Sequence, residues 1–438
     1  CKNTSMLVNW KVALLSSALL LSVALVSFLY VERPREGLLV FGTAHTNALN
    51  NLDNENWITS MQKVGNSNLR TISFADRKHG WVGGLQARVD TYFQVSSVSK
   101  SELFSTDDGG QTWQPVGFEV SDDSYIAFVN RINKNDGLVV IQKPAVRSHQ
   151  RGLQIFDTRD SGSTWTLVFD VQDFLARKFV IDQNGLGWVV GNRGIDRNAS
   201  PVAAWTNDGG KTWASISTRN APWLADVVDG PGNIEDVVVL AGQRVFLVFS
   251  NDRIIEIERS GDRWRRRQAY VSRTSGKAAM IGFDGNSPII MQAINRSGWD
   301  LETVVHFSGP VGDGTVNLPN IFVRSTLVNG GTIAAAGSRT RQQIESSAAN
   351  TTTRFEVDAR VLMSNDHGRN WETIKVISGY DKTIVDRGPG TDLYIETTCA
   401  AKTCEDASTV GLNDIAWNGE TYFICGNNGL IITARAMR

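Results

Sequence analysis

Hydrophobic and polar residues alternate with a period of two along most of this chain, as in β-strands that are buried on one face. Leu69 to Phe74 alternates in this way, and after a polar turn a second run follows from Trp81 to Gly84. The same two-strand unit returns at 179–182 with 187–191 and at 412–417 with 422–426. Weaker versions begin near Tyr125, Val237, Ala278 and Ile321. The pattern predicts an all-β architecture built from repeats.

A motif of eight residues recurs beside these predicted strands. Its copies are TDDGGQTW at 106–113, TRDSGSTW at 158–165, TNDGGKTW at 206–213 and SNDHGRNW at 364–371. A decayed copy at 257–264 keeps Gly261 and Trp264 but has Arg259 in place of the aspartate. The aspartates of the first three copies are 52 and 48 residues apart. Strand-rich repeats of this length are typical of propeller blades.

The shared pattern matches the Asp-box repeat found in sialidases and related β-propellers. We expect its glycine to supply the positive φ of a hairpin turn, its aspartate to accept backbone hydrogen bonds, and its tryptophan to pack between sheets. Residues with the same role in every blade cannot all reach one catalytic or metal site. We therefore assign a structural role to these residues: Asp108, Trp113, Asp160, Trp165, Asp208, Trp213, Asp366 and Trp371.

Counting the first strands predicts seven blades. They span 69–116, 124–169, 177–217, 236–268, 278–318, 321–376 and 412–434. The last blade lacks a fourth strand, and a strand near Trp57 has no blade of its own, so we expect this N-terminal strand to close the ring. The predicted domain is a seven-bladed β-propeller over residues 57–438.

The N-terminal residues 1–31 differ from the rest in composition. Val12 to Tyr30 is a run of 19 residues without a charge, which is long enough to span a bilayer as a helix. We interpret it as one uncleaved transmembrane anchor, with a removed signal peptide as the alternative. Residues 32–56 form a polar linker. The propeller is then expected on the exported side, in the periplasm, a lumen or the extracellular space.

The cysteines, the histidines and the net charge indicate which disulfide, metal, cofactor and nucleic-acid interactions the sequence favours. Cys399 and Cys404 are close enough in sequence to form a small disulfide, or they are two unpaired thiols in a loop, while Cys425 is expected to be buried in a strand. The five histidines are scattered without metal-ligand spacing, and no motif indicates a cofactor. The net charge of −1 does not favour nucleic acid as a partner.

Long insertions fall mainly at the end of the blades opposite the repeated motif. They are predicted as loops at 85–101, 192–202, 218–235, 338–358 and 379–411. Loops that cluster on one face of a rigid scaffold often bind partners, and arginine and aromatic residues are typical of protein interfaces. The candidate binding residues on this face are Arg88, Tyr92, Arg193, Arg197, Trp223, Arg339, Arg341 and Arg387.

Two features together resemble one family: a Phe-x-Asp…Gly-Trp-x-x-Gly unit at Phe74 to Gly84, and the repeated Asp-box motifs. The chain is similar to the seven-bladed photosystem II assembly and stability factor propellers and their homologues in non-photosynthetic bacteria. The resemblance covers about 57–434 and is poor in the insertions. It implies an export-side assembly factor that binds a membrane-protein partner and has no catalytic activity.

An enzyme is the main alternative. Asp-box propellers include sialidases and other glycoside hydrolases, which need two carboxylates on either side of the bond that breaks. The Arg-Ile-Pro motif of sialidases is absent from this sequence, and nothing singles out a pair of acids. Binding of carbohydrate without cleavage is a third reading. The sequence favours a non-catalytic scaffold for a protein partner.

Overall fold

The computed structural model describes residues 57–437, except for 90–94, 121–123, 144–151, 183, 195–199, 217–220, 222–233, 241–243, 250–252, 261–262, 272–276, 285–286, 298–299, 308–313, 319–320, 330, 347–350, 387–393 and 400–410. The predicted anchor at Val12 to Tyr30 and the linker at 32–56 lie outside these residues. Within the described part, no helix has the length and hydropathy needed to cross a bilayer. All described residues belong to one compact unit, Phe41–Arg438.

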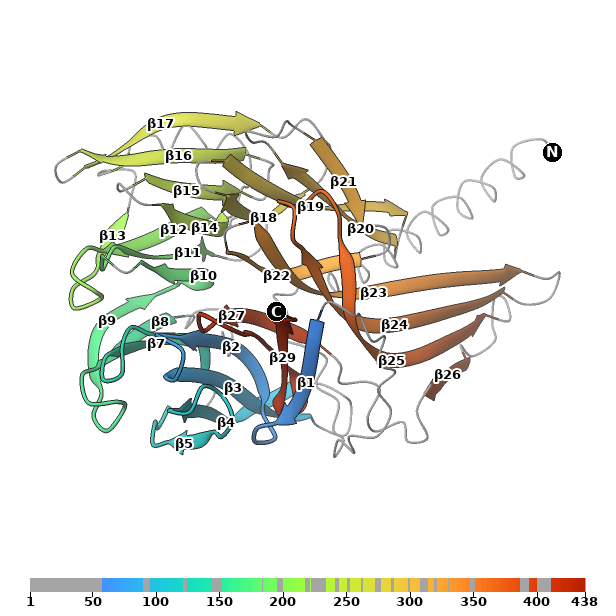
Figure 1. The fold of residues 1–438 in the computed structure, drawn as a ribbon, viewed down its shortest axis with the longest axis horizontal. Helices are drawn as coiled ribbons and strands as arrows, with labels where there is room; N and C mark the ends of the chain where they lie inside the picture. The colour runs from blue at the N-terminus through green and yellow to red at the C-terminus, as the bar shows by residue number, and fades with distance from the viewer. Residues whose placement is uncertain are drawn as a thin grey trace, which may run out of the picture. The chain divides into compact units, whose positions relative to one another are not determined.

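The described residues form seven antiparallel sheets, shown in Figure 1. The first contains β2 (Asn68–Phe74), β3 (Gly80–Val89), β4 (Val95–Thr106) and β5 (Gln114–Val116). The second contains β6 (Tyr125–Arg131), β7 (Gly137–Lys143), β8 (Gly152–Thr158) and β9 (Thr166–Gln172). The third contains β10 (Leu175–Ile181), β11 (Gly187–Arg193), β12 (Ser200–Thr206) and β13 (Ala214–Ile216). Each begins within two residues of its predicted start.

The next two sheets follow the same order of four strands. One contains β14 (Ile234–Leu240), β15 (Arg244–Phe249), β16 (Arg253–Ser260) and β17 (Arg263–Val271). The other contains β18 (Lys277–Asp284), β19 (Ser287–Ser297), β20 (Asp300–Phe307) and β21 (Gly314–Leu318). Consecutive strands pair as hairpins throughout, so each sheet is a meander.

The sixth sheet has five strands instead of four. It contains β22 (Ile321–Asn329), β23 (Thr332–Ser346), β24 (Thr351–Ser364), β25 (Glu372–Asp386) and β26 (Tyr394–Cys399). The last sheet contains β27 (Leu412–Trp417), β28 (Tyr422–Gly426), the short 3-10 helix η2 (Asn427–Gly429) and β29 (Leu430–Ala436).

The N-terminal strand completes the last sheet. β1 (Trp57–Lys63) pairs antiparallel with β29 over its whole length, from Trp57 opposite Ala436 to Lys63 opposite Leu430. Both ends of the described chain therefore lie in one sheet. This pairing confirms the predicted closure by an N-terminal strand. Without β1, the outer edge of β29 would be unpaired.

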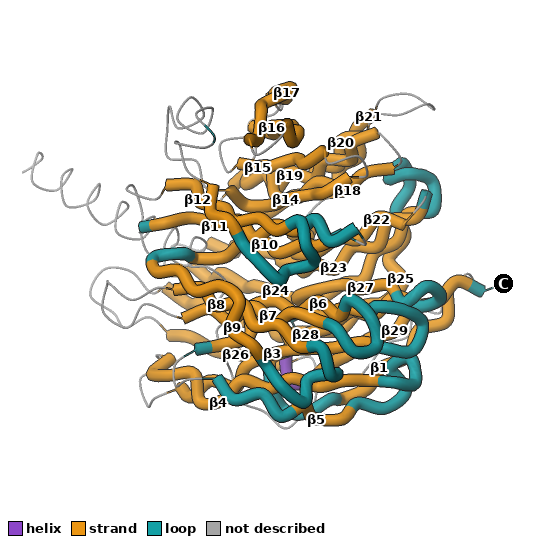
Figure 2. The backbone as a smooth tube through the Cα atoms, turned by 90° about the vertical axis from the view of Figure 1, so that its left-hand side faces the viewer, coloured by secondary structure: helices purple, strands orange, loops and turns teal. Residues whose placement is uncertain are grey.

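The sheets meet through their first strands. Each first strand contacts the first strand of the next sheet, in the order β2, β6, β10, β14, β18, β22 and β27, and β27 contacts β2. Apolar side chains fill the spaces between neighbouring sheets, and Trp81 and Trp188 are fully buried there. Strands make up most of the described backbone in Figure 2. The expected all-β, propeller-type architecture is present.

The prediction of loops at 338–358 and 379–411 is wrong for the described residues of these ranges, because 338–346, 351–358, 379–386 and 394–399 are strand. β23 pairs with β22 only as far as Arg339, but its pairing with β24 continues to Ser346 opposite Thr351. β25 and β26 extend the same region. We call residues 340–346, 351–358, 380–386 and 394–399 the arm; Figure 1 shows its long strands. The insertion at 85–101 is likewise mostly strand, since β3 and β4 extend into it.

Candidate functional site

The repeated motifs form tight turns, and each aspartate is bound within its own turn. In the turn at 206–213, Thr206 Oγ1 donates a hydrogen bond of 2.7 Å to Asp208 Oδ1. Thr212 donates to the same carboxylate from its N–H at 3.0 Å and from its hydroxyl at 2.6 Å. Gly210, at φ 87°, donates its N–H to Thr206 Oγ1 at 3.0 Å. The same arrangement recurs around Asp108, Asp160 and Asp366.

These bonds stabilise the charged carboxylate. Burial raises the pKa of Asp208, but the hydrogen bonds from Thr212 and Thr206 outweigh it and hold the pKa below its usual value. The pKa of Asp108, Asp160 and Asp366 is lowered by the same kind of contact. The four carboxylates are thus used locally, in four separate turns.

The tryptophans of the turns join neighbouring sheets. Trp165 lies 5.6 Å from Trp81 of the preceding sheet, measured between ring centroids. Trp213 lies 6.2 Å from Phe169 and 5.9 Å from Phe179, on β9 and β10. Such aromatic contacts add to the apolar area that each ring buries.

The decayed copy at 257–264 keeps this packing without the aspartate. Trp264 contacts Trp188 at 4.7 Å and Trp205 at 5.4 Å, between ring centroids. Arg259 takes the place of the aspartate and lies over the Trp205 ring at 4.6 Å. Gly261 lies outside the described residues. The tryptophan contact is therefore independent of the aspartate's bonds.

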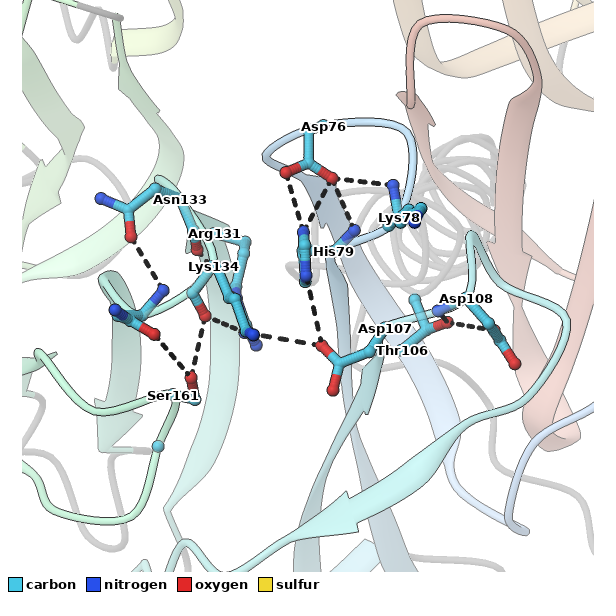
Figure 3. A network of polar contacts seen from close by, with 12 residues as sticks. Asp76, Lys78, His79, Thr106, Asp107, Asp108, Arg131, Asn133, Lys134 and Ser161 are labelled. Carbon is cyan, nitrogen blue, oxygen red and sulfur yellow. Dashed lines mark hydrogen bonds and ion pairs between the residues drawn. The ribbon is translucent and has the colours of Figure 1, made fainter.

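A buried arginine anchors the turns of the first two sheets, as Figure 3 shows. Arg131 donates from Nε to the Asn133 carbonyl at 3.0 Å and from Nη2 to the Lys134 carbonyl, while Nη1 has no partner in the described part of the chain. Its guanidinium lies 4.6 Å from the centre of the Trp81 ring and 3.9 Å from Asp107 Oδ1. Burial lowers the pKa of Arg131, and the charges of Asp107 and Asp76 raise it.

The candidate binding residues are only partly within the described structure. Arg193 is half exposed and lies 3.9 Å from Asp173, whereas Arg339 binds Asp358 through Nε at 3.0 Å and Nη2 at 2.6 Å. These two arginines thus belong to separate ion pairs. Arg88 and Arg341 lie on β3 and β23, and their side chains are outside the description. The remaining candidates are outside the described residues altogether: Tyr92, Arg197, Trp223 and Arg387.

The cysteines are resolved to different degrees. Cys425 is buried with a free thiol, and burial raises its pKa well above the usual value. Cys399 is the last residue of β26, and Cys404 lies outside the described residues. The disulfide between them stays a prediction.

A set of residues that the sequence did not single out lies at the start of the first strands. In every sheet, the pairing of the first strand with the second skips one residue near its beginning. Such a bulge re-aims the skipped side chain. We call these the bulge residues: Arg70, Ala127, Arg177, Glu235, Ala279, Arg324 and Asn413. Four of the bulge residues are charged: Arg70, Arg177, Glu235 and Arg324. A charged residue near the start of a predicted inner strand was the signal in the sequence that could have located these positions.

The bulge residues differ in their partners. Arg177 Nε lies 3.9 Å from Glu235 Oε2. Asn413 donates from Nδ2 to the Leu69 carbonyl at 2.7 Å and to Asn427 Oδ1 at 3.0 Å. Arg70 lies over the Tyr125 ring, 5.0 Å from its centre. The first strands begin at the end of the sheets where the predicted binding face lies, so these side chains sit at that end of the inner strands.

Comparison with one solved structure supports the fold. The chain resembles a solved structure described as "YCF48 bound to D1 peptide", with a TM-score of 0.51 and 17% identity over 89% of this chain and 100% of that one. It also matches virginiamycin B lyase from Staphylococcus aureus with a TM-score of 0.43 and 12% identity, over 87% of this chain and 100% of the lyase. Saccharomyces cerevisiae Sqt1 matches with a TM-score of 0.45 and 8% identity, over 87% of this chain and 99% of Sqt1. No family model and no curated protein matches the sequence.

Proposed function

We propose that this protein is a seven-bladed Asp-box propeller, anchored to a membrane by Val12 to Tyr30, that acts as a non-catalytic scaffold for a protein partner. The propeller lies on the exported side and serves in the assembly or stabilisation of a membrane complex. The similar structure of YCF48 was solved with a D1 peptide, which makes a peptide segment of another protein the first partner to consider.

The arm is the observation that carries this proposal. Beyond Arg339, β23 pairs only with β24 among the described residues, so its other edge, at 340–346, is available for an added strand. Open strand edges recognise extended peptides through main-chain hydrogen bonds. Arg339 and Arg360 both bind Asp358 at the base of the arm, with Arg360 Nε at 2.8 Å from Oδ1. Two cations on one carboxylate leave a positive charge beside this edge.

The repeated turns support a structural rather than catalytic use of the aspartates. Each carboxylate accepts hydrogen bonds from its own turn, and catalysis of glycoside cleavage needs two carboxylates that face one bond. A pair of that kind is not among the contacts of these turns.

Shortening the arm tests the binding proposal. Thr340 and Val357 are directly paired, so an Asn-Gly turn can replace 341–356 and keep the register. We expect the shortened full chain to lose the membrane proteins that crosslink to the wild type in native membranes, measured by mass spectrometry. The control is Asp107→Ala, which leaves the arm intact. It changes the end of the sheets that carries the repeated eight-residue turns, which we call the turn end. Equal crosslinking by the wild type and the shortened chain would contradict the proposal.

The enzyme alternative has a separate test. The wild type is incubated with fluorogenic sialosides and a panel of glycans, and we expect no turnover. Turnover that is lost on substitution of one carboxylate would replace the scaffold by a glycoside hydrolase. Retention on the glycan panel without turnover would indicate a carbohydrate-binding propeller.

A further inference from the structure

Two of the bulge residues are arginines without a counter-charge. Arg324 makes no hydrogen bond or ion pair with the described residues, and its Nε is buried without a partner. Arg70 contacts the face of the Tyr125 ring and likewise has no carboxylate partner there. A guanidinium N–H that is buried without a hydrogen bond is costly, because it loses water and gains nothing in return.

The two arginines lie on β2 and β22, the first strands on either side of β27. Asp414 on β27 accepts a hydrogen bond of 3.1 Å from the N–H of Ile72 and one of 3.0 Å from Ser325 Oγ. Ile72 is two residues after Arg70, and Ser325 directly follows Arg324. One carboxylate thus holds together the two strand starts that carry the arginines.

The surroundings increase the repulsion between the two arginines. Burial lowers the pKa of Arg324, and the like charge of Arg70 lowers it further. Asp414 is already bound by Ile72, Ile415 and Ser325, and the charge of Lys178 acts on it from β10. Within the described residues, neither Arg70 nor Arg324 forms an ion pair with an acid.

We propose that Arg70 and Arg324 form a binding site for a small oxyanion between the first strands β2 and β22. Guanidinium groups present several N–H donors to the oxygens of such an ion, and the ion would supply the negative charge that the fold lacks at this point. The site is a ligand site of its own and does not depend on the protein partner proposed above.

Anion-dependent stability tests the site. The full chain in detergent is melted in sulfate, phosphate, acetate and chloride at one sodium concentration. A ligand that binds only the folded state raises the melting temperature. We expect sulfate or phosphate to raise it by about 3 °C or more over chloride in the wild type. Arg70→Gln and Arg324→Gln should each lose most of this difference, and titration calorimetry should show at least tenfold weaker binding.

The control separates binding from the general effect of sulfate, which stabilises many proteins. Arg267→Gln removes an exposed arginine on β17 and should respond to sulfate as the wild type does. Arg324→Lys keeps the charge and should retain part of the response. If Arg70→Gln and Arg324→Gln respond to sulfate as fully as the wild type, the site does not exist. Acetate as effective as sulfate and phosphate would identify the ligand as a carboxylate and overturn the assignment to an inorganic oxyanion.

Discussion

Arg131 and Arg324 both lie in the inner part of the same unit, but their surroundings differ: Arg131 is buried, whereas Arg324 is partly exposed with a buried Nε. Arg131, at the turn end, donates to two carbonyl groups, stacks on Trp81 and faces Asp107. Arg324, at the other end, is repelled by the charge of Arg70 and has no hydrogen-bond or ion-pair partner among the described residues. The first arginine completes its site, whereas the second leaves its site incomplete.

The difference between the two arginines suggests that one end of the sheets serves stability and the opposite end serves binding. At the turn end the aspartates and hydroxyl groups of the repeated motif are bound to one another, although Nε1 of Trp113 and of Trp165 has no partner among the described residues. At the opposite end the arginine pair and the open edge of the arm both leave groups that a second molecule can satisfy. Unsatisfied buried polar groups in a native structure call for an explanation, and a ligand is one such explanation.

The sharpest test of the comparison replaces each arginine by methionine, which has similar bulk. Arg131→Met leaves the Asn133 carbonyl without a donor, whereas Ser161 Oγ still donates to the Lys134 carbonyl at 2.9 Å. It also removes the cation from Trp81, so it should destabilise the protein by about 3 kcal/mol. Arg324→Met removes a repelled charge and should change stability by less than about 1 kcal/mol, or increase it. Denaturant unfolding in a low-salt buffer measures both. Equal losses would show that the two arginines are equally structural.

The sequence was sufficient for the parts of the fold that repeat. Alternation located the first strands to within a few residues, and the missing strand at the C-terminal end predicted the pairing of β1 with β29. Both signals are local, since a half-buried strand must alternate. The eight-residue motif likewise located the turns.

The arm and the arginine pair were beyond this reasoning for physical reasons. Residues 340–346 and 351–358 extend past the pairing with β22, and strands with no core beside them need not alternate. Arg70 and Arg324 lie at bulges, which break the alternation. The face of the sheet to which each side chain points therefore cannot be predicted from the sequence pattern. Their proximity depends on the arrangement of β2, β22 and β27, which no sequence spacing specifies.

Substitution of the neighbouring residues Asp107 and Asp108 tests how much the hydrogen bonds within a turn contribute to stability. Asp108 accepts hydrogen bonds from Thr106 and Thr112, whereas Asp107 is mostly exposed and has only ion contacts near 4 Å. Asp108→Ala should cost about 2 kcal/mol. Asp107→Ala should cost about 0.5 kcal/mol, because Asp107 is mostly exposed and its contacts with His79 and the buried Arg131 are both near 4 Å. Thermal melting of the two variants measures the difference, and similar losses would mean that the bonds within the turn contribute little.

Acid should weaken the turn end as well. Burial raises the pKa of Asp76, but hydrogen bonds from the side chain and N–H of His79 and the N–H of Lys78 lower it to about 2. Because this pKa is below the ordinary value of 3.8, the stabilisation is fully present above about pH 4 and is lost as the pH falls towards 2. The melting temperature should fall in that range, and Asp76→Asn should show a smaller fall. A variant with the full acid dependence of the wild type would exclude Asp76 as its source.

The smallest effect is expected where an arginine is paired but exposed. Arg267 is 53% exposed and contacts Glu258 at 3.1 Å and Glu256 at 3.6 Å. Glu256 is buried, but Arg244 Nε remains bound to it at 2.7 Å when Arg267 is removed. Arg267→Gln should therefore change stability by less than about 0.5 kcal/mol. Chemical denaturation beside Arg131→Met checks this, and a loss approaching that of Arg131→Met would show that the stability of this fold does not depend on whether its paired arginines are buried.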